Sequence, residues 1–290
     1  DLQSMGYNSA DYIHTLLEVF KLGFSDRHTY YGDPEFVDVP IEGLISKSFA
    51  KSRCVDIDNR LASSEMPLPG NPWAFQSGTS PNRAMDLPIP KSGGLGEDTS
   101  YTCVVDKWGN VFSATPSDTF DSTPMVPGLG FILSSRGNQS WLDPSHPSAL
   151  APGKRPRLTP NPALAFKGGR PWMPFGTPGG DVQCQAMTEM FINIVDFGMD
   201  PQQAIEGPRF ATGSYPGSFW PHAYNPGLVT VEGRIENSVV SELKRRGHNV
   251  EMWDDWDIRA GNLAAIEIDH ERGILRAGAD SRREGYAIAR

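Results

Sequence analysis

Long apolar runs, paired cysteines and an excess of positive charge are all missing from this chain of 290 residues. No stretch approaches the roughly 20 apolar residues that a membrane-spanning helix requires, so no membrane span is expected. The 26 basic residues are outnumbered by 35 acidic ones, which gives a net charge of −9. A general affinity for nucleic acid or anionic lipid is therefore not expected, because few counterions would be released on binding.

The three cysteines, Cys54, Cys103 and Cys184, stand too far apart for a disulfide framework or a zinc site. Unpaired thiols favour a reducing, cytoplasmic compartment over a periplasmic or secreted one, but they leave the compartment open. The chain starts at Asp1 without a methionine or a signal segment, so we expect it to begin inside a longer gene product. No internal repeat is visible, and a hydrophobic content of 38% indicates a globular protein.

Helical periodicity and composition divide the chain into an early helical part, a segment rich in proline, glycine and serine, and a later part with two further helices. Asn8 or Ser9 can cap a helix whose apolar residues recur at helical spacing, and a second helix is expected over 46–61. From residue 66 to residue 96 proline, glycine and serine dominate, which is typical of a linker or an exposed, cleavable loop. Two later helices are expected over 183–197 and 235–246.

Three β-hairpins are predicted in the second part of the chain. Each consists of two apolar runs separated by a glycine-containing turn, at 101–115, 162–175 and 264–277. Antiparallel hairpins grouped with helices favour an α+β layered domain over a doubly wound parallel sheet.

The junction of the flexible segment with the first hairpin carries the most specific chemical signal. A glycine-rich stretch at 93–98 delivers Thr99 to the start of a strand. If the bond between Asp98 and Thr99 were cut, Thr99 would carry a hydroxyl and a free α-amine, and the amine could serve as the general base for the hydroxyl. An α-amine titrates near 7.7–8.0, close enough to neutrality for this role. The alternative is a threonine that only begins a strand.

A second element supports catalysis. Gly179 and Gly180 lie between a predicted strand and the following helix, where successive amides can point into one cavity. Such amides can form an oxyanion hole, which stabilises the charge that develops on a tetrahedral intermediate. The alternative is an ordinary strand–helix turn.

Taken together, five motifs resemble the gamma-glutamyltransferase (gamma-glutamyltranspeptidase) family of N-terminal-nucleophile hydrolases. The resemblance extends over nearly all of the chain. The motifs are Phe24–Arg27 with Tyr31–Pro34, Thr99–Asn110, Gly153–Pro156, Gly176–Gly180 and Gly278–Arg283.

The resemblance implies a four-layer αββα sandwich with antiparallel sheets. Residues 1–98 would be the C-terminal part of the large-subunit region, ending in a processing loop, and residues 99–290 the catalytic small-subunit region of the same domain. The front part of the large subunit would be missing here, and cleavage of the zymogen would give an αβ heterodimer or a higher assembly. No cofactor is implied, and because the histidines form no i, i+4 pair, no metal site is expected.

The same resemblance assigns roles to single residues. Thr99 falls on the nucleophile, Asp98 on the residue before the self-cleaved bond, and Ser117 on a hydroxyl that supports the nucleophile. Gly179 and Gly180 fall on the oxyanion pair. Substrate-binding positions of the family correspond here to Ser134, Ser135, Arg136 and Thr159.

The substrate pocket departs from the family pattern. An arginine, Arg136, stands where the family carries an acid, and Leu158 precedes Thr159 in place of a pair of serines. This change disfavours an ammonium group and favours an anionic or carbonyl-rich one. The sequence thus predicts an amide hydrolase or acyltransferase that acts on a small amide or peptide. Gamma-glutamyl transfer or glutathione-type hydrolysis, a cephalosporin-acylase-like activity on another amide, and an uncleaved, non-catalytic relative remain open.

Overall fold

The computed structural model describes residues 1–78, 99–118 and 123–289, and no helix in these ranges is both long and apolar enough to cross a bilayer. Asp98 and the whole glycine-rich stretch at 93–98 therefore lie outside the described residues. The first part of the chain is helical: α1 (Leu2–Met5), α2 (Ala10–Tyr30), α3 (Ile41–Leu44), α4 (Lys47–Arg53), η1 (Cys54–Asp56) and η2 (Pro72–Phe75).

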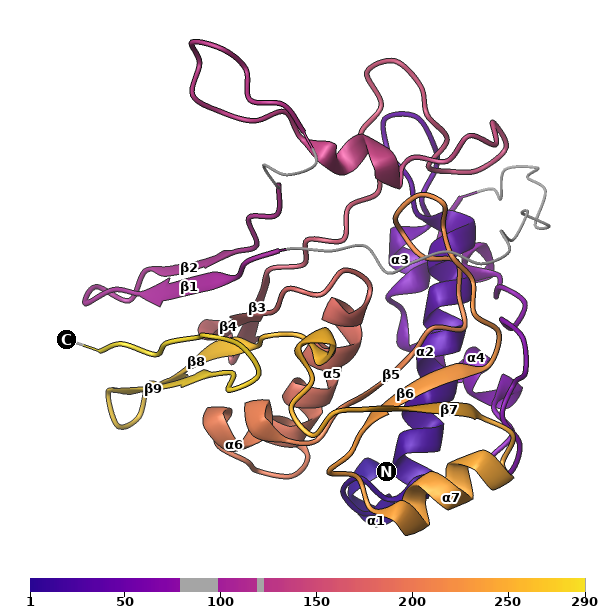
Figure 1. Ribbon diagram of the computed structural model, residues 1–290, viewed down its shortest axis with the longest axis vertical. Helices are drawn as coiled ribbons and strands as arrows, with labels where there is room; N and C mark the ends of the chain where they lie inside the picture. The colour runs from indigo at the N-terminus through magenta and orange to yellow at the C-terminus, as the bar shows by residue number, and fades with distance from the viewer. Residues whose placement is uncertain (79–98, 119–122, 290) are drawn as a thin grey trace.

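The second part alternates strands with helices (Figure 1). Its elements are β1 (Thr102–Val105), β2 (Val111–Ala114), η3 (Ser135–Gln139), β3 (Ala163–Lys167), β4 (Arg170–Gly176), α5 (Val182–Val195), α6 (Pro201–Glu206), β5 (Phe210–Thr212), β6 (Leu228–Glu232), α7 (Asn237–Arg245), β7 (Asn249–Trp253), η4 (Ile258–Ala260), β8 (Ala264–Asp269) and β9 (Ile274–Ala279).

All three predicted hairpins are present, as β1–β2, β3–β4 and β8–β9, and each pairs antiparallel. The last two join in a four-stranded sheet of order β3-β4-β8-β9. The first predicted helix is also confirmed, since the Ser9 hydroxyl accepts a hydrogen bond from the Tyr12 amide at 3.1 Å and so caps α2.

The helix expected over 46–61 is wrong in length. Regular α-structure ends at Arg53, followed by a short 3₁₀ turn. Beyond it the Asp58 carboxylate accepts hydrogen bonds from the amides of Arg60 and Leu61, at 2.8 and 3.2 Å. Because an aspartate that satisfies nearby backbone amides competes with helix formation, the chain turns here instead.

A third sheet, β5-β6-β7, was not anticipated, and its pair β6–β7 is parallel. Helices α2 and α7 pack together against it through a shared core: Ile13, Leu16, Leu17, Phe210, Val229, Val231, Val240 and Leu243. The parallel pairing is an exception within an otherwise antiparallel α+β arrangement.

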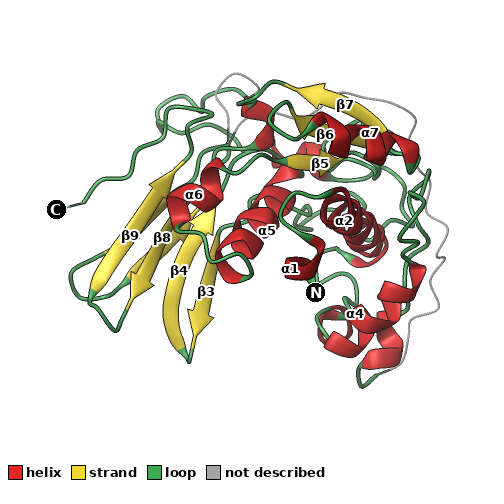
Figure 2. Cartoon of the chain, turned by 90° about the horizontal axis from the view of Figure 1, so that it is seen from below, coloured by secondary structure: helices red, strands yellow, loops and turns green. Residues whose placement is uncertain are grey.

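Three layers can be followed around the four-stranded sheet. Helices α5 and α6 lie along one face (Figure 2), where Phe175 stacks on Phe191 of α5 at 5.5 Å. At the next residue of β4, a Cβ on Gly176 would collide with the ring of Tyr101. Because successive strand residues point to opposite faces, the β1–β2 hairpin covers the face opposite to α5. Helices α5 and α6, the four-stranded sheet and the β1–β2 hairpin therefore lie in successive layers, as they do in a sandwich.

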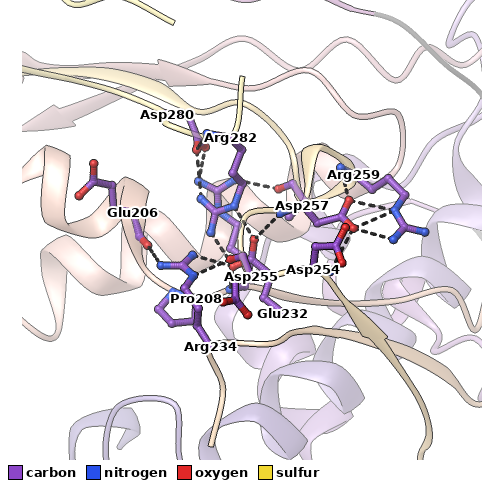
Figure 3. Close-up of polar contacts among 12 residues, drawn as sticks. Glu206, Pro208, Glu232, Arg234, Asp254, Asp255, Asp257, Arg259, Asp280 and Arg282 are labelled. Atoms are coloured by element: carbon purple, nitrogen blue, oxygen red, sulfur yellow. Dashed lines mark hydrogen bonds and ion pairs between the residues drawn. The ribbon is translucent and has the colours of Figure 1, made fainter. Parts of the chain in front are cut away.

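A buried ion network joins the two larger sheets (Figure 3). The Arg282 guanidinium donates to both oxygens of the Glu232 carboxylate at 2.6 Å, and both side chains are 0% exposed. Asp280 bridges Arg282 and Arg209, at 3.1 and 2.5 Å. The network ties the end of β9 to β6 and to the residues that follow α6, so the side chains of Asp280 and Arg282 are fixed in the interior.

Breaking the Arg282–Glu232 pair should lower the stability of the fold. We expect Arg282→Met to lower the free energy of unfolding by about 3–5 kcal/mol, because it leaves Glu232 buried without its main partner. Urea unfolding of the purified protein measures the change. The matched control is Arg245→Met, which removes an exposed ion pair with Glu242 and should cost under about 1 kcal/mol. Equal costs for the two variants would contradict this role of the network.

Candidate active site

The two ends of the β1–β2 hairpin bring Thr99 and Ser117 together. The register pairs Thr102 with Ala114, and continuing it outwards places residue 99 opposite residue 117. The Ser100 amide donates to the Pro116 carbonyl at 3.0 Å, which keeps that register beyond the strands. Thr99 Oγ1 and Ser117 Oγ lie 2.5 Å apart, and Thr99 is only 6% exposed. The predicted nucleophile and its predicted supporting hydroxyl are therefore in direct contact.

Arg136 approaches the same hydroxyl pair from η3. Its Nη2 donates to Ser117 Oγ at 2.5 Å, and in the described part of the chain its nearest carboxylate is that of Asp118, 3.8 Å from Nε. Ser134 caps η3, since its hydroxyl accepts from the Arg136 amide, and donates to Asp118 at 2.8 Å. Burial lowers the pKa of Arg136, and Asp118 opposes this effect. A cation thus lies next to the hydroxyl pair, and within the described residues only the partly exposed Asp118 pairs with it.

The glycine loop, residues 177–180, begins where the end of β4 meets the β1–β2 hairpin. Tyr101, two residues after Thr99, packs its ring against Gly176 at the end of β4. Gly179 and Gly180 have φ values of +123° and +55°, a region that favours glycine. Their carbonyls accept from the first α5 amides, at 2.9 and 3.3 Å, and within the described ranges their own amides donate no backbone hydrogen bond. The loop can therefore offer two amides at a helix N-terminus.

The loop is held from behind by residues 261 and 262. The Asn262 amide donates to Thr177 Oγ1 at 2.7 Å, and that hydroxyl donates to the Pro178 carbonyl at 2.8 Å. Gly261 lies so close that a Cβ there would be 2.6 Å from Thr177 Oγ1. The absence of a side chain at 261 is what allows this contact.

A second group of charges surrounds Asp181, which directly follows the glycine loop. Asp181 accepts from Arg27 at 2.5 Å and from the amide and hydroxyl of Ser218, both at 2.7 Å. Burial opposes its ionisation, but Arg27 and Arg157 lower the pKa of its carboxyl. Arg157 donates to the same Ser218 hydroxyl at 3.3 Å.

Arg157 is under-satisfied. Its Nε and Nη1 atoms are buried and have no hydrogen-bond partner among the described residues, and only 8% of the residue is exposed. Burial and the neighbouring Arg27 lower the pKa of Arg157 to about 9, with Asp181 acting in the opposite sense. Together Arg27 and Arg157 exceed the charge of Asp181, so the interior beside the glycine loop has a net positive character.

The other predicted substrate positions lie near Arg136, but they differ in exposure. Ser134 is exposed and Ser135 half-buried at the start of η3, and Thr159 is buried and accepts from Gln139 at 3.1 Å. The sequence interpretation assigned no role to Asp181, Arg27 or Ser218, whereas it took the basic run that ends at Arg157 as structural ion pairing or as a wall of the substrate pocket. An aspartate directly after paired glycines at a helix start was the available signal for the first of these.

Among the described residues, His14, Glu18 and His248 form the one group of ligand atoms close enough to hold a metal ion. Its members already form a hydrogen-bonded network, in which only His248 Nδ1 has no partner among the described residues. The two histidine rings contact each other at 2.9 Å, and the buried Lys21 ammonium lies 2.7 Å from Glu18. Because a cation already neutralises the carboxylate, we interpret this cluster as structural.

Comparisons with known proteins identify the family of the chain. The Gamma-glutamyltranspeptidase family model matches residues 1–290, and the chain belongs to that family. The Glutathione hydrolase-like YwrD proenzyme of Bacillus subtilis is 35% identical over 99% of this chain and 49% of its own length. The Oxamate amidohydrolase proenzyme of Klebsiella pneumoniae is 30% identical over 97% of this chain and 47% of its own length.

The solved structure of LmbA2991HD matches with a TM-score of 0.85 and 39% identity, over 98% of this chain and 49% of that one. The chain thus spans about half the length of the relatives it matches. These relatives confirm the predicted family and fold class and support a hydrolase role. Proenzymes of which this chain matches only a part are consistent with a two-subunit assembly.

The contact behind the glycine loop can be tested on stability. Gly261 and Gly247 have nearly equal φ values, +96° and +95°, but a Cβ at Gly247 would meet nothing within 4 Å. We expect Gly247→Ala to cost about 1–3 kcal/mol from backbone strain alone. Gly261→Ala should cost at least about 1 kcal/mol more in urea unfolding, because it also displaces Thr177. Equal losses would show that this close approach does not constrain the loop.

Proposed function

We propose that this protein is an amide hydrolase that cleaves its own backbone between Asp98 and Thr99 and then uses Thr99 as its nucleophile. The observation that supports this most directly is the 2.5 Å contact between Thr99 Oγ1 and Ser117 Oγ, next to the Arg136 guanidinium. A threonine that served only as a strand former would have no need of a buried hydroxyl and a cation at its side chain.

Turnover then follows from the chemistry of the freed residue. The Thr99 amine takes the proton from Oγ1, and the oxygen attacks the amide carbon of the substrate. The Gly179 and Gly180 amides hold the oxyanion of the tetrahedral intermediate. The amine returns the proton to the leaving nitrogen, and water, or an acceptor amine in a transfer reaction, releases the acyl group.

The net positive character beside the glycine loop favours an acyl group that carries a carboxylate or several carbonyl oxygens. Arg157, with two buried nitrogen atoms that have no partner in the described part of the chain, offers donors for such a group. A relative named for oxamate, the anionic amide of oxalate, is compatible with this class. Gamma-glutamyl amides are the second candidate, because another relative is named as glutathione hydrolase-like.

The nucleophile is tested by Thr99→Ala. Denaturing mass spectrometry of the purified wild-type protein should show a fragment that begins at Thr99, and the variant should remain uncut and inactive, because it lacks the attacking oxygen. Thr99→Ser is the matched control and should retain cleavage. A variant with alanine at 99 that is still cut and active would overturn the proposal, as would a wild-type protein that is never cut.

The substrate class is tested by comparing oxamate and other amides whose acyl group carries a carboxylate and no ammonium with gamma-glutamyl anilide, whose acyl group carries both. We expect higher kcat/KM for the amides without an ammonium. Arg157→Gln should raise KM for them by about 10-fold, equivalent to about 1.4 kcal/mol for a lost hydrogen bond to a charged group. A preference for gamma-glutamyl anilide that Arg157→Gln leaves unchanged would favour the second candidate.

A further inference from the structure

Arg136 contacts the proposed nucleophile through one intermediate hydroxyl. The three groups form a chain of hydrogen bonds: Arg136 Nη2 lies 2.5 Å from Ser117 Oγ, which lies 2.5 Å from Thr99 Oγ1. The sequence suggested a substrate-binding role for Arg136, because an acid was replaced by a cation. The contacts suggest a different role.

The direction of the hydrogen bonds follows from the chemistry of the groups. A guanidinium can only donate, so Ser117 Oγ accepts from Arg136. When Thr99 Oγ1 loses its proton during attack, it can only accept, and Ser117 must then donate to it. In that state the chain of hydrogen bonds runs from Arg136 through Ser117 to Thr99, and the positive charge supports the developing negative charge on the threonine oxygen.

The surroundings of Arg136 strengthen this effect. The residue is 6% exposed, and the Phe219 ring lies 5.4 Å from the guanidinium carbon. Asp118, 3.8 Å away, is 46% exposed at its side chain and therefore compensates the charge only in part. Hydrogen bonds that involve an ionised donor are stronger than neutral ones, and they gain strength where water is excluded.

We propose that Arg136 is a positioning residue that acts through Ser117 to facilitate deprotonation of Thr99, in self-cleavage as well as in turnover. The inference rests on the proposed function. In self-cleavage Thr99 Oγ1 attacks the carbonyl carbon of Asp98, the C–N bond breaks, and the nitrogen keeps the electron pair and takes the proton from Oγ1. Water then hydrolyses the ester and leaves a free carboxylate and a free threonine amine.

Self-cleavage separates this role from substrate binding, because no substrate carboxylate takes part in it. We expect Arg136→Met to slow the appearance of the fragment that begins at Thr99, and to lower kcat, by about 10- to 100-fold, which corresponds to the loss of one charge-assisted hydrogen bond. KM for carboxylate-bearing and for neutral amides should change by less than about 3-fold. In the pH profile of kcat, the rise of activity with pH should move to higher pH, since deprotonation at Thr99 becomes harder without the nearby positive charge.

A double-mutant cycle tests the route through Ser117. Once Ser117→Ala has removed the intermediate hydroxyl, the additional change Arg136→Met should slow self-cleavage by less than about 2-fold. Arg136→Lys, which retains the charge, should recover part of the rate and provides a second variant if Arg136→Met folds poorly. Arg245→Met, an exposed arginine remote from these contacts, is the control and should cleave at the wild-type rate.

Two results would overturn the inference while leaving the proposed function intact. One is wild-type self-cleavage in Arg136→Met together with a raised KM for carboxylate-bearing amides alone. The other is full additivity of the two substitutions in the cycle. If the wild-type protein itself fails to cleave at Thr99, the proposed function fails first, and the role of Arg136 with it.

Discussion

The buried pairing of Arg282 with Glu232 is the constraint on which the geometry of the site depends. It fixes Asp280, whose carboxylate also accepts the Leu263 amide at 2.9 Å. Arg209, held by Asp280, donates in turn to the Ala260 carbonyl at 2.8 Å. The segment between these anchors presents Gly261 and Asn262 to Thr177 and thereby braces the glycine loop. An ion network far from Thr99 in the sequence thus determines where the loop amides lie.

Two independent scaffolds meet at the site. The hairpin β1–β2 provides Thr99 and Ser117 through its register, and the four-stranded sheet with α5 provides the glycine loop. Tyr101 against Gly176 is a contact that sets one scaffold relative to the other. Because each scaffold is fixed by its own hydrogen bonds, Thr99 and the loop amides are each held in place, which is what electrostatic preorganisation of the proposed site would require.

Much of this arrangement could be predicted from the sequence, because it rests on local patterns. Alternating apolar runs around glycine turns indicated the hairpins, and Ser9 indicated the start of α2. The sheet β5-β6-β7 escaped prediction because β5 has three residues and because β6 and β7 pair in parallel across the intervening α7. Local propensity carries little information about such a pairing.

The residues of the proposed site likewise divide into those that the sequence indicated and those that it did not. Thr99, Ser117 and the paired glycines stand in recognisable motifs, and the structure places the two hydroxyls in contact as expected. The arginines could not be interpreted from residue type alone. Arg136 contacts Ser117 because the fold brings two segments 19 residues apart together. Arg157 is buried with two nitrogen atoms that have no partner among the described residues. The roles of buried charges depend on what excludes water from them, and a linear pattern does not show this.

The register of one short hairpin also chooses between two neighbouring hydroxyls. Thr99 and Ser100 are adjacent and chemically similar, yet Thr99 faces Ser117 in the interior while Ser100 is exposed. Strand alternation makes the choice binary, because a slip of one residue would exchange the inner and outer positions. The hydrogen bond from the Ser100 amide to the Pro116 carbonyl therefore fixes which of the two hydroxyls faces Ser117.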